Sequence, residues 1–124
     1  MKAKRFGFIG AGFMAEAVLR GILEGRVFPT QALVAADVAD ARRRAFAALG
    51  VETTPEALEV VKTCGTVLVA VKPQDLPDLL RGIGPQLAAE QLVLTVCAGC
   101  PTGLFEESSS AEVRVVRAMP NLPV

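Results

Sequence analysis

Two glycines and an alanine near the start of the chain have the spacing of a phosphate-binding turn. Gly10, Gly12 and Ala15 fit the pattern G-x-G-x-x-A, and the apolar run from Phe6 to Ile9 precedes them. Gly10 would allow a tight turn, Gly12 would let backbone N–H groups approach a pyrophosphate, and Ala15 would let the next helix pack closely. A glycine turn alone is weak evidence, but its place between a strand and a helix is the context that dinucleotide binding requires. The pattern therefore predicts a dinucleotide-binding turn rather than a merely structural one.

Apolar segments alternate with helical patterns along the rest of the chain. Strands are expected at residues 6–9, 32–36, 51–53, 66–71, 92–97 and 113–116, and helices at about 14–24, 42–49, 55–64, 76–87 and 101–107. We expect Asp37 or Asp40 to cap the second helix, and Thr54 to cap the third with Pro55 at its first position. The alternation predicts an α/β, Rossmann-type doubly wound, mainly parallel sheet of about six strands in the order 3-2-1-4-5-6.

Ligands of such sheets bind outside the carboxyl ends of the strands, at the switch point between strands one and four. The candidate site therefore comprises the residues just past each strand: 10–14, Asp37, 70–74, 97–100 and 119–121. Asp37 ends the second strand, where a carboxylate can accept hydrogen bonds from the adenosine ribose hydroxyls. A 2′-phosphate there would face this carboxylate, so we expect NAD(P)H as the cofactor, with NADH preferred to NADPH.

Three consecutive arginines on the second predicted helix bear on this preference. Arg42, Arg43 and Arg44 are either a solvated helix face or cations that neutralise a nearby anion. Successive helical residues fan out by about 100°, so one or at most two of them can point at one anion. We expect the arginines to soften the preference for NADH without reversing it.

The composition indicates one globular domain. Of the 124 residues, 52% are hydrophobic and 21% are charged, and thirteen basic residues balance thirteen acidic ones. No net charge favours nucleic acid or a membrane surface. No apolar run approaches the length of a membrane span, and the first strand begins too early for a signal peptide. We expect a cytoplasmic protein without nucleic-acid or membrane partners.

Cys97 and Cys100 have the spacing C-x-x-C, which can form a redox pair or part of a metal site. A zinc site needs two more ligands, and the chain has no histidine and one further cysteine, Cys64. The alternative is that these small residues simply end the fifth strand. We favour that alternative and expect no bound metal.

Four segments that follow predicted strands share their motifs with one enzyme family. They are residues 8–15 (F-I-G-A-G-F-M-A), 69–74 (V-A-V-K-P-Q), 97–99 (C-A-G) and 117–123 (R-A-M-P-N-L-P). In this order they resemble the pyrroline-5-carboxylate reductases, whose motifs are F-I-G-A-G-x-M-A, A-V-K-P-[QH], x-A-G and R-x-M-P-N-x-P. The resemblance covers essentially the whole chain, but only the cofactor half of the family pattern.

The resemblance implies an NAD(P)H-dependent oxidoreductase of proline biosynthesis, which transfers a hydride to the C=N carbon of 1-pyrroline-5-carboxylate and gives L-proline. Positioning the nicotinamide against the protonated imine would supply much of the catalysis. The resemblance assigns the pyrophosphate to Ile9, Gly10, Ala11, Gly12, Phe13 and Met14. It assigns the nicotinamide side to Ala70, Val71, Lys72, Pro73, Ala98 and Gly99, and a catalytic role to Asn121. Lys72, at a strand end, could also orient the cofactor or the substrate, so we expect a catalytic role for it as well.

Some of these residues have plainer interpretations. Lys72 could be a solvated lysine before a proline turn, and Asn121, flanked by prolines, is a common turn residue on sequence grounds. Several family members have an asparagine that contacts the cofactor where this chain has Ala57. Family members continue into a helical domain that carries a substrate motif and through which they homo-oligomerise.

We therefore expect residues 1–124 to form an NAD(P)-binding Rossmann domain of a truncated form that is inactive alone, with the C-terminal helical dimerisation and substrate domain absent. Two alternatives remain. The chain could be a non-catalytic NAD(P)-binding isoform or fragment, or the cofactor domain of a related hydroxyacid-type dehydrogenase.

Overall fold

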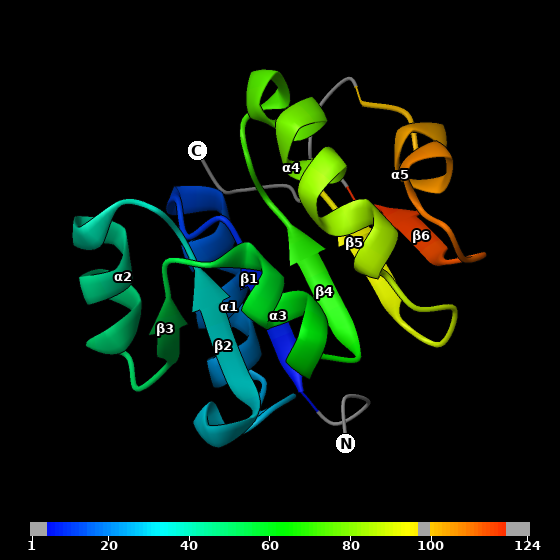
Figure 1. The fold of residues 1–124 in the computed structure, drawn as a ribbon. Coiled ribbons are helices and arrows are strands. Elements are labelled where there is room, and N and C mark those ends of the chain that lie inside the picture. Colours follow the sequence, from blue (N-terminus) through cyan, green and yellow to red (C-terminus); the bar gives the residue numbers. More distant parts are fainter. Residues whose placement is uncertain (1–4, 97–99, 119–124) are drawn as a thin grey trace.

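The computed structural model of the chain describes residues 5–96 and 100–118 (Figure 1). Its six strands form one sheet in the spatial order β3-β2-β1-β4-β5-β6, and every neighbouring pair is parallel. The predicted doubly wound fold and its strand order are confirmed. The strands are β1 (Phe6–Ile9), β2 (Leu33–Ala36), β3 (Glu52–Thr54), β4 (Thr66–Val69), β5 (Leu92–Thr95) and β6 (Arg114–Arg117).

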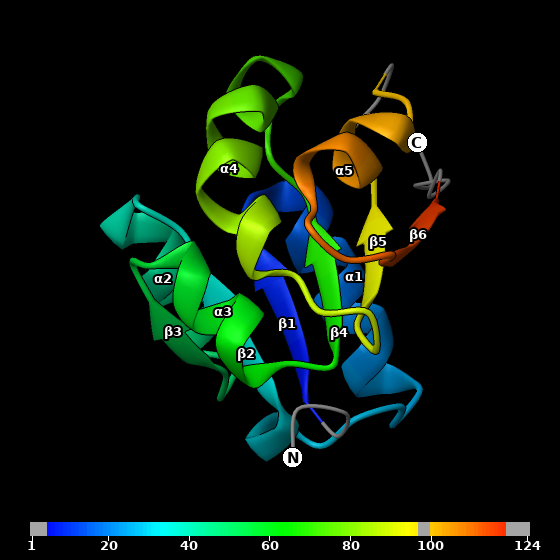
Figure 2. The ribbon, with the colours of Figure 1, turned by 45° about the vertical axis from the view of Figure 1, so that its right-hand side comes forward.

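Helices cover both faces of this sheet. Helices α3, α4 and α5 lie on one face, and α1 lies on the other (Figure 2). The helices are α1 (Phe13–Glu24), α2 (Asp40–Ala47), α3 (Ala57–Thr63), α4 (Leu76–Ile83) and α5 (Gly103–Ser108). Three short 3₁₀ turns connect them to the strands: η2 (Thr30–Ala32), η3 (Pro73–Asp75) and η4 (Gly84–Gln86).

The sheet separates two apolar cores because successive strand residues point to opposite faces. On β1, Phe6 and Phe8 pack with α1 and α2, where the rings of Phe8 and Phe46 meet edge to face at 5.5 Å. On the opposite face, a Cβ at Gly7 would lie only 2.3 Å from Cγ1 of Val60. Helix α3 therefore packs directly on the backbone of β1, which a larger residue than glycine would prevent.

Two predicted helix caps are wrong. Helix α3 begins at Ala57 with Glu56 as its N-cap, because the Thr54 hydroxyl accepts a hydrogen bond from the Glu56 N–H and forms a turn before the helix. Helix α2 has Ala39 as its N-cap and no side-chain cap. Asp37 accepts a hydrogen bond from the Ala39 N–H outside the helix.

Several predicted elements are too long, among them the strand expected at 92–97, which ends at Thr95. The apolar run of residues 66–71 forms a strand only as far as Val69, because Ala70 and Val71 line a pocket instead. Helix α4 ends at Ile83, and η4 follows. Pro85 has no N–H to donate to a further helical turn, so the helical hydrogen bonds cannot continue.

The fully buried Gln91 was not singled out from the sequence, although it connects several elements. Its Nε2 donates to the carbonyl oxygens of Val61 and Cys64 at 2.6 and 2.8 Å, and its Oε1 accepts from the Ala88 N–H at 2.7 Å. This side chain therefore joins the end of α3 to the loop before β5. Within residues 5–96 and 100–118, no helix combines the length and hydrophobicity needed to cross a membrane.

Candidate dinucleotide-binding site

A pocket of about 590 Å³ lies at the carboxyl ends of β1, β2 and β4. This is the switch point at which the sequence predicts a ligand, because the chain crosses from one half of the sheet to the other between β1 and β4. The lining residues come from four loops or helix starts: Ile9, Gly10, Gly12, Ala36, Asp37, Val38, Ala39, Arg42, Pro55, Ala57, Ala70, Val71, Lys72, Asp75 and Leu79.

The two glycines of the turn have different roles. Gly10 has φ +96°, and a Cβ there would lie 2.6 Å from the carbonyl oxygen of Ala70. Gly12 has φ −76°, which any residue can adopt, and a Cβ there would meet no atom within 4 Å. Gly10 is therefore needed to form the turn against β4, whereas Gly12 leaves open space at the pocket wall.

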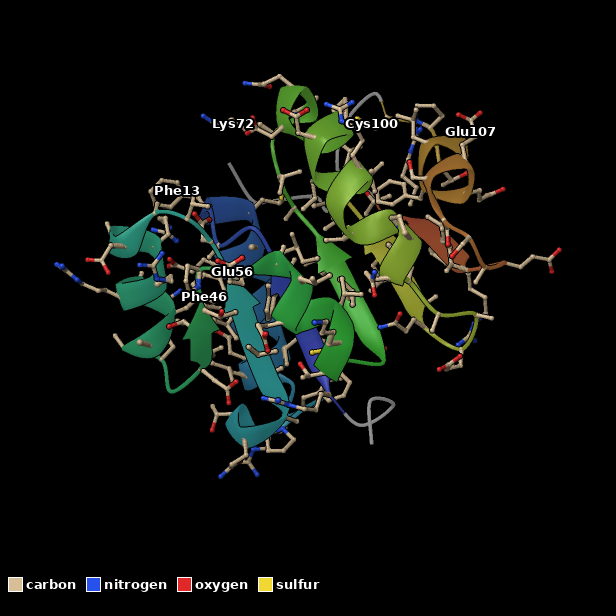
Figure 3. The ribbon with its side chains drawn as sticks, in the orientation of Figure 1. Phe13, Phe46, Glu56, Lys72, Cys100 and Glu107 are labelled. Carbon is tan, nitrogen blue, oxygen red and sulfur yellow. The ribbon has the colours of Figure 1, made fainter. Side chains whose placement is uncertain are left out.

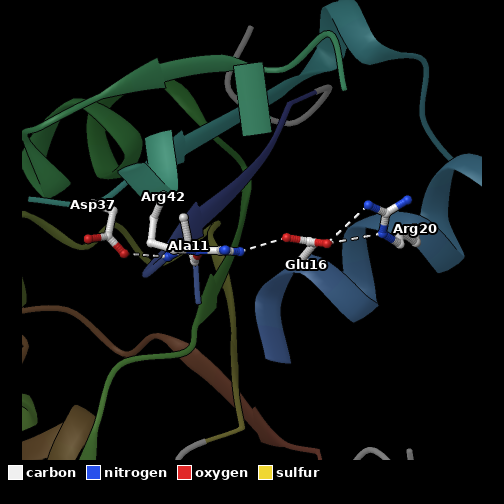
Figure 4. Close-up of polar contacts among 5 residues, drawn as sticks. All are labelled: Ala11, Glu16, Arg20, Asp37 and Arg42. Carbon is white, nitrogen blue, oxygen red and sulfur yellow. Dashed lines mark hydrogen bonds and ion pairs between the residues drawn. The ribbon is translucent and has the colours of Figure 1, made fainter. Parts of the chain in front are cut away.

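The backbone N–H and the carbonyl oxygen of Ala11 both have side-chain partners (Figure 4). Its N–H donates to Oδ2 of Asp37 at 2.8 Å, and its carbonyl oxygen accepts from Nε of Arg42 at 2.6 Å. The preceding Gly10 N–H donates to the carbonyl of Ala36 at 2.8 Å. The loops after β1 and β2 are therefore tied together, and the orientation of the turn is fixed before any ligand binds.

The N-terminus of α1 supplies the free donors of the turn. Gly12 is its N-cap, and the first N–H groups of a helix have no partner inside the helix. Helix α1 has twelve residues, so its dipole adds positive potential at this end. The buried Ala15 lets α1 pack closely on the sheet, as its small size predicts. An anion in front of Gly12, Phe13 and Met14 would therefore meet backbone donors.

Asp37 lies half-buried in the pocket at the end of β2. Its Oδ1 accepts from the Ala39 N–H at 2.8 Å, while its Oδ2 holds Ala11. Each carboxylate oxygen has a second lone pair, so these contacts leave capacity for a ligand hydroxyl. The carboxylate thus stands where the sequence predicts a ribose contact, and it also helps to shape the glycine turn.

The three arginines of α2 do not converge on one point. Arg42 pairs with Glu16 of α1 at 2.7 Å and lies over the Phe13 ring, 4.6 Å from its centroid. Arg43 donates to the main-chain oxygen of Asp37 at 2.7 Å, and Arg44 is 79% exposed and pairs with Asp40. Only Arg42 of the three lines the pocket. The hydrogen bond from Arg42, followed by that from Arg20, lowers the pKa of Glu16 below its usual value.

Lys72 lies exposed at the edge of the pocket and forms no ion pair with any residue in the described ranges. Lys72, in the loop after β4, and Phe13, the first residue of α1, both lie at the carboxyl end of the sheet (Figure 3). This placement leaves both the role in orienting a ligand and the interpretation as a solvated lysine open.

The predicted site residues are only partly brought together. Ile9, Gly10, Gly12, Asp37, Ala70, Val71 and Lys72 line the pocket. Ala11 in the glycine turn, Phe13 and Met14 at the start of α1, and Pro73 at the start of η3 lie next to these residues in the sequence but do not line it. The predictions for Ala98, Gly99 and Asn121 fall outside the described residues, as does Cys97 of the C-x-x-C pair.

The described residues contain no group of three or more acidic, cysteine or histidine side chains that could hold a metal ion. Cys64 lies on the α3 face of the sheet, where burial raises the pKa of its thiol. Such a thiol is a poor nucleophile, and it does not line the pocket.

Sequence reasoning missed several pocket residues. Ala57 was considered only because several family members have an asparagine at this position. The sequence did not indicate that Val38, Pro55 or Leu79 would line the pocket. The partnership of Arg42 with Glu16 was also missed. These two residues are 26 positions apart, so no helical spacing indicates the contact.

Comparison with known proteins assigns the family. Residues 5–99 match the family described as NADP oxidoreductase coenzyme F420-dependent. The chain belongs to this family. Within it, the glycine turn at the start of α1 and the pocket at the switch point lie in the matched region.

Proteins similar to this chain include named reductases. Pyrroline-5-carboxylate reductase 3 of Rattus norvegicus is 40% identical over 121 residues, which is 97% of this chain and 44% of the relative. The solved pyrroline-5-carboxylate reductase of Coxiella burnetii matches with a TM-score of 0.86 and 27% identity, over 99% of this chain and 46% of that one. The Plasmodium falciparum pyrroline carboxylate reductase with NADP bound matches with a TM-score of 0.79 and 25% identity, over 98% and 44% of the two chains. The chain therefore spans less than half the length of these relatives.

Proposed function

We propose that residues 1–124 form the NAD(P)H-binding domain of a pyrroline-5-carboxylate reductase, which reduces the C=N bond of 1-pyrroline-5-carboxylate to give L-proline. The main support is the pocket at the switch point, with a helix N-terminus and an unhindered Gly12 at its wall. The names of the similar proteins supply the substrate.

The residues present fit a bound dinucleotide. The N–H groups at the start of α1 would hold the pyrophosphate, and the open space at Gly12 would let it approach the backbone. Asp37 would accept hydrogen bonds from the adenosine ribose at the end of β2. The loop of Ala70, Val71 and Lys72 would border the nicotinamide on the β4 side.

NAD(P)H would supply the hydride that the imine carbon accepts. The chain's own contribution is to position the ring and to exclude water from it. In this proposal Lys72 orients the cofactor or the substrate, and Asn121 has the catalytic role that the family motif implies. Ala11, Phe13, Met14, Pro73, Ala98 and Gly99 keep the cofactor-binding roles that the resemblance implies.

We infer a preference for NADH over NADPH from the charges at the end of β2. A 2′-phosphate there would face the Asp37 carboxylate, and at ~5 Å and an effective dielectric of ~20 each pair of unit charges repels by about 3 kcal/mol. Arg42 and Arg43 already have partners in Glu16, Asp37 and Asp40. The test measures the dissociation constants of NADH and NADPH for the wild type and for Asp37→Ser, all at one ionic strength. A wild type that prefers NADPH contradicts this assignment.

We further expect the 124 residues to bind cofactor without appreciable turnover by themselves, because the relatives named as reductases are about twice as long. Homo-oligomerisation through a C-terminal domain, as the resemblance implies for full-length members, belongs to the same proposal. So does a cytoplasmic setting, which remains an expectation from the sequence that the structure does not test.

The experiment that tests the function joins this chain to the part of the Rattus norvegicus relative that its match does not cover. We expect the chimera to oxidise NADH when 1-pyrroline-5-carboxylate is added, and to form proline. A control chimera with Gly12→Val should lose this activity. A folded chimera that binds NADH but forms no proline would favour a non-catalytic NAD(P)-binding chain. Robust proline formation by the 124 residues alone would overturn the expected lack of turnover.

A further inference from the structure

The carboxylate of Glu16 connects helices α1 and α2 beside the pocket (Figure 4). Its Oε1 accepts from Nη2 of Arg42 at 2.7 Å, and its Oε2 accepts from Nε of Arg20 at 3.1 Å. The side chains of Glu16 and Arg42 are 19% and 22% exposed, whereas that of Arg20 is 57% exposed. Because solvent screens the contact with Arg42 less, this contact is the stronger of the two.

Arg42 is the guanidinium of α2 that reaches the pocket wall. Its Nε donates to the Ala11 carbonyl at 2.6 Å and its plane lies over Phe13, so two contacts fix its position in addition to Glu16. Asp37 and Val38 line the same part of the pocket, where the adenosine ribose is proposed to bind. A guanidinium there is well suited to a 2′-phosphate, because it binds phosphate oxygens with two parallel hydrogen bonds.

We propose that Glu16 is a specificity-determining residue that lowers the affinity of the pocket for a 2′-phosphate by neutralising and holding Arg42. The proposal rests on the proposed dinucleotide binding, and it assigns part of the NADH preference to a residue outside the pocket wall. Glu16 acts through Arg42 and touches neither the 2′ position nor the reacting atoms. The hydrogen bonds from Arg42 and Arg20 lower its pKa, so the carboxylate is ionised at neutral pH.

Glu16 also lies in the first turn of α1, where its charge would affect the pyrophosphate of either dinucleotide. This effect is common to NADH and NADPH, so it cancels in the ratio of their dissociation constants. The ratio therefore reports only on the 2′-phosphate. A partial loss of folded protein or a weaker pyrophosphate site affects both dinucleotides equally and leaves the ratio unchanged.

The experiment measures that ratio at low and at physiological ionic strength for Glu16→Gln, Arg42→Met and the double variant. We expect Glu16→Gln to shift the ratio toward NADPH by about three- to tenfold, and salt to reduce the shift. The shift should be absent when Arg42→Met is already present. Glu24→Gln, an equal change of charge at an exposed position of the same helix, should leave the ratio unchanged.

Arg20→Met gives an independent test that does not disturb the contact with Arg42. Removing this exposed cation leaves more of the Glu16 charge uncompensated, so we expect the ratio to move toward NADH. An unchanged ratio in Glu16→Gln with both dinucleotides bound overturns the proposal, as does a shift that persists with Arg42→Met. If a folded wild type binds neither dinucleotide, the proposed function itself fails, and this inference fails with it.

Discussion

Replacing Gly12 with valine separates ligand binding from folding at the glycine turn. A Cβ at Gly12 meets no protein atom within 4 Å, and the backbone has φ −76°, so valine fits without strain. Because glycine is a better N-cap than valine, we expect the substitution to cost about 1 kcal/mol of stability. The valine side chain would instead fill the pocket space that an anion needs in order to approach the helix N-terminus.

The expected loss of binding is much larger. A hydrogen bond from a backbone N–H to a charged group contributes about 1.5–3 kcal/mol, so losing two of them costs about 3–6 kcal/mol. This corresponds to a decrease of about 10²- to 10⁴-fold in the affinity for NADH. A loss of binding free energy that clearly exceeds the loss of folding free energy is what a phosphate-binding turn predicts.

The assay is a titration followed by NADH fluorescence, with circular dichroism to measure unfolding. The chain has no tryptophan or tyrosine, so its own emission does not overlap. Gly21→Val is the matched control, because Gly21 lies on the same helix, is exposed and has no atom within 4 Å of an added Cβ. Both variants should fold, and only Gly12→Val should lose binding. A folded Gly12→Val protein that binds NADH as the wild type does would refute the assignment of this turn.

Three further predictions follow from contacts elsewhere. Gly10→Ala should destabilise the fold by about 2 kcal/mol or more, in contrast to Gly12→Val, because of its φ of +96° and the Ala70 carbonyl at 2.6 Å; equal unfolding midpoints for Gly10→Ala and the wild type would contradict this. Gln91→Leu should lower the free energy of unfolding by about 3 kcal/mol, since two buried carbonyl oxygens and the half-buried Ala88 N–H lose their partner, while the exposed Gln86→Leu should change it by less than about 0.5 kcal/mol. The unperturbed pKa of Glu16 is 4.5, so its stabilising effect should be complete above pH 4.5. The effect should disappear as the pH falls through the lowered pKa of Glu16 in the folded state. Chemical unfolding of wild type and Glu16→Gln across this range measures it, and a difference in stability that grows in acid would exclude the ion pair as its cause.

The sheet was predictable because strands and helices alternate in the sequence, and because a glycine turn after the first strand indicates the switch point. The ends of the elements were less predictable. The apolar run at residues 66–71 contains both the core residues of β4 and two residues of the pocket wall. Since both are apolar, the sequence pattern does not show where the strand ends. Similarly, Thr54 has the residue type of a helix cap but bonds to Glu56 in a turn before the helix.

The position of Asp37 was predictable, but its bond to the Ala11 N–H was not. The bond depends on the register of β1 and β2, which places Ile9 opposite Ala36 and so brings the two following loops together. The contact between Glu16 and Arg42 depends in addition on how α1 and α2 pack against one another. Local patterns encode the strands and turns, whereas contacts between side chains of different helices depend on packing that a single sequence does not display.

The most direct test of the proposed site is a titration of the isotope-labelled chain with NADH, followed by the NMR signals of its backbone amides. We predict saturable shifts at Gly12, Phe13 and Met14 and at the end of β2, with the buried amide of Gln91 unaffected. Saturable shifts confined to residues away from the carboxyl ends of β1, β2 and β4, or no saturable shifts in the folded chain, would contradict the assignment of this pocket to a dinucleotide.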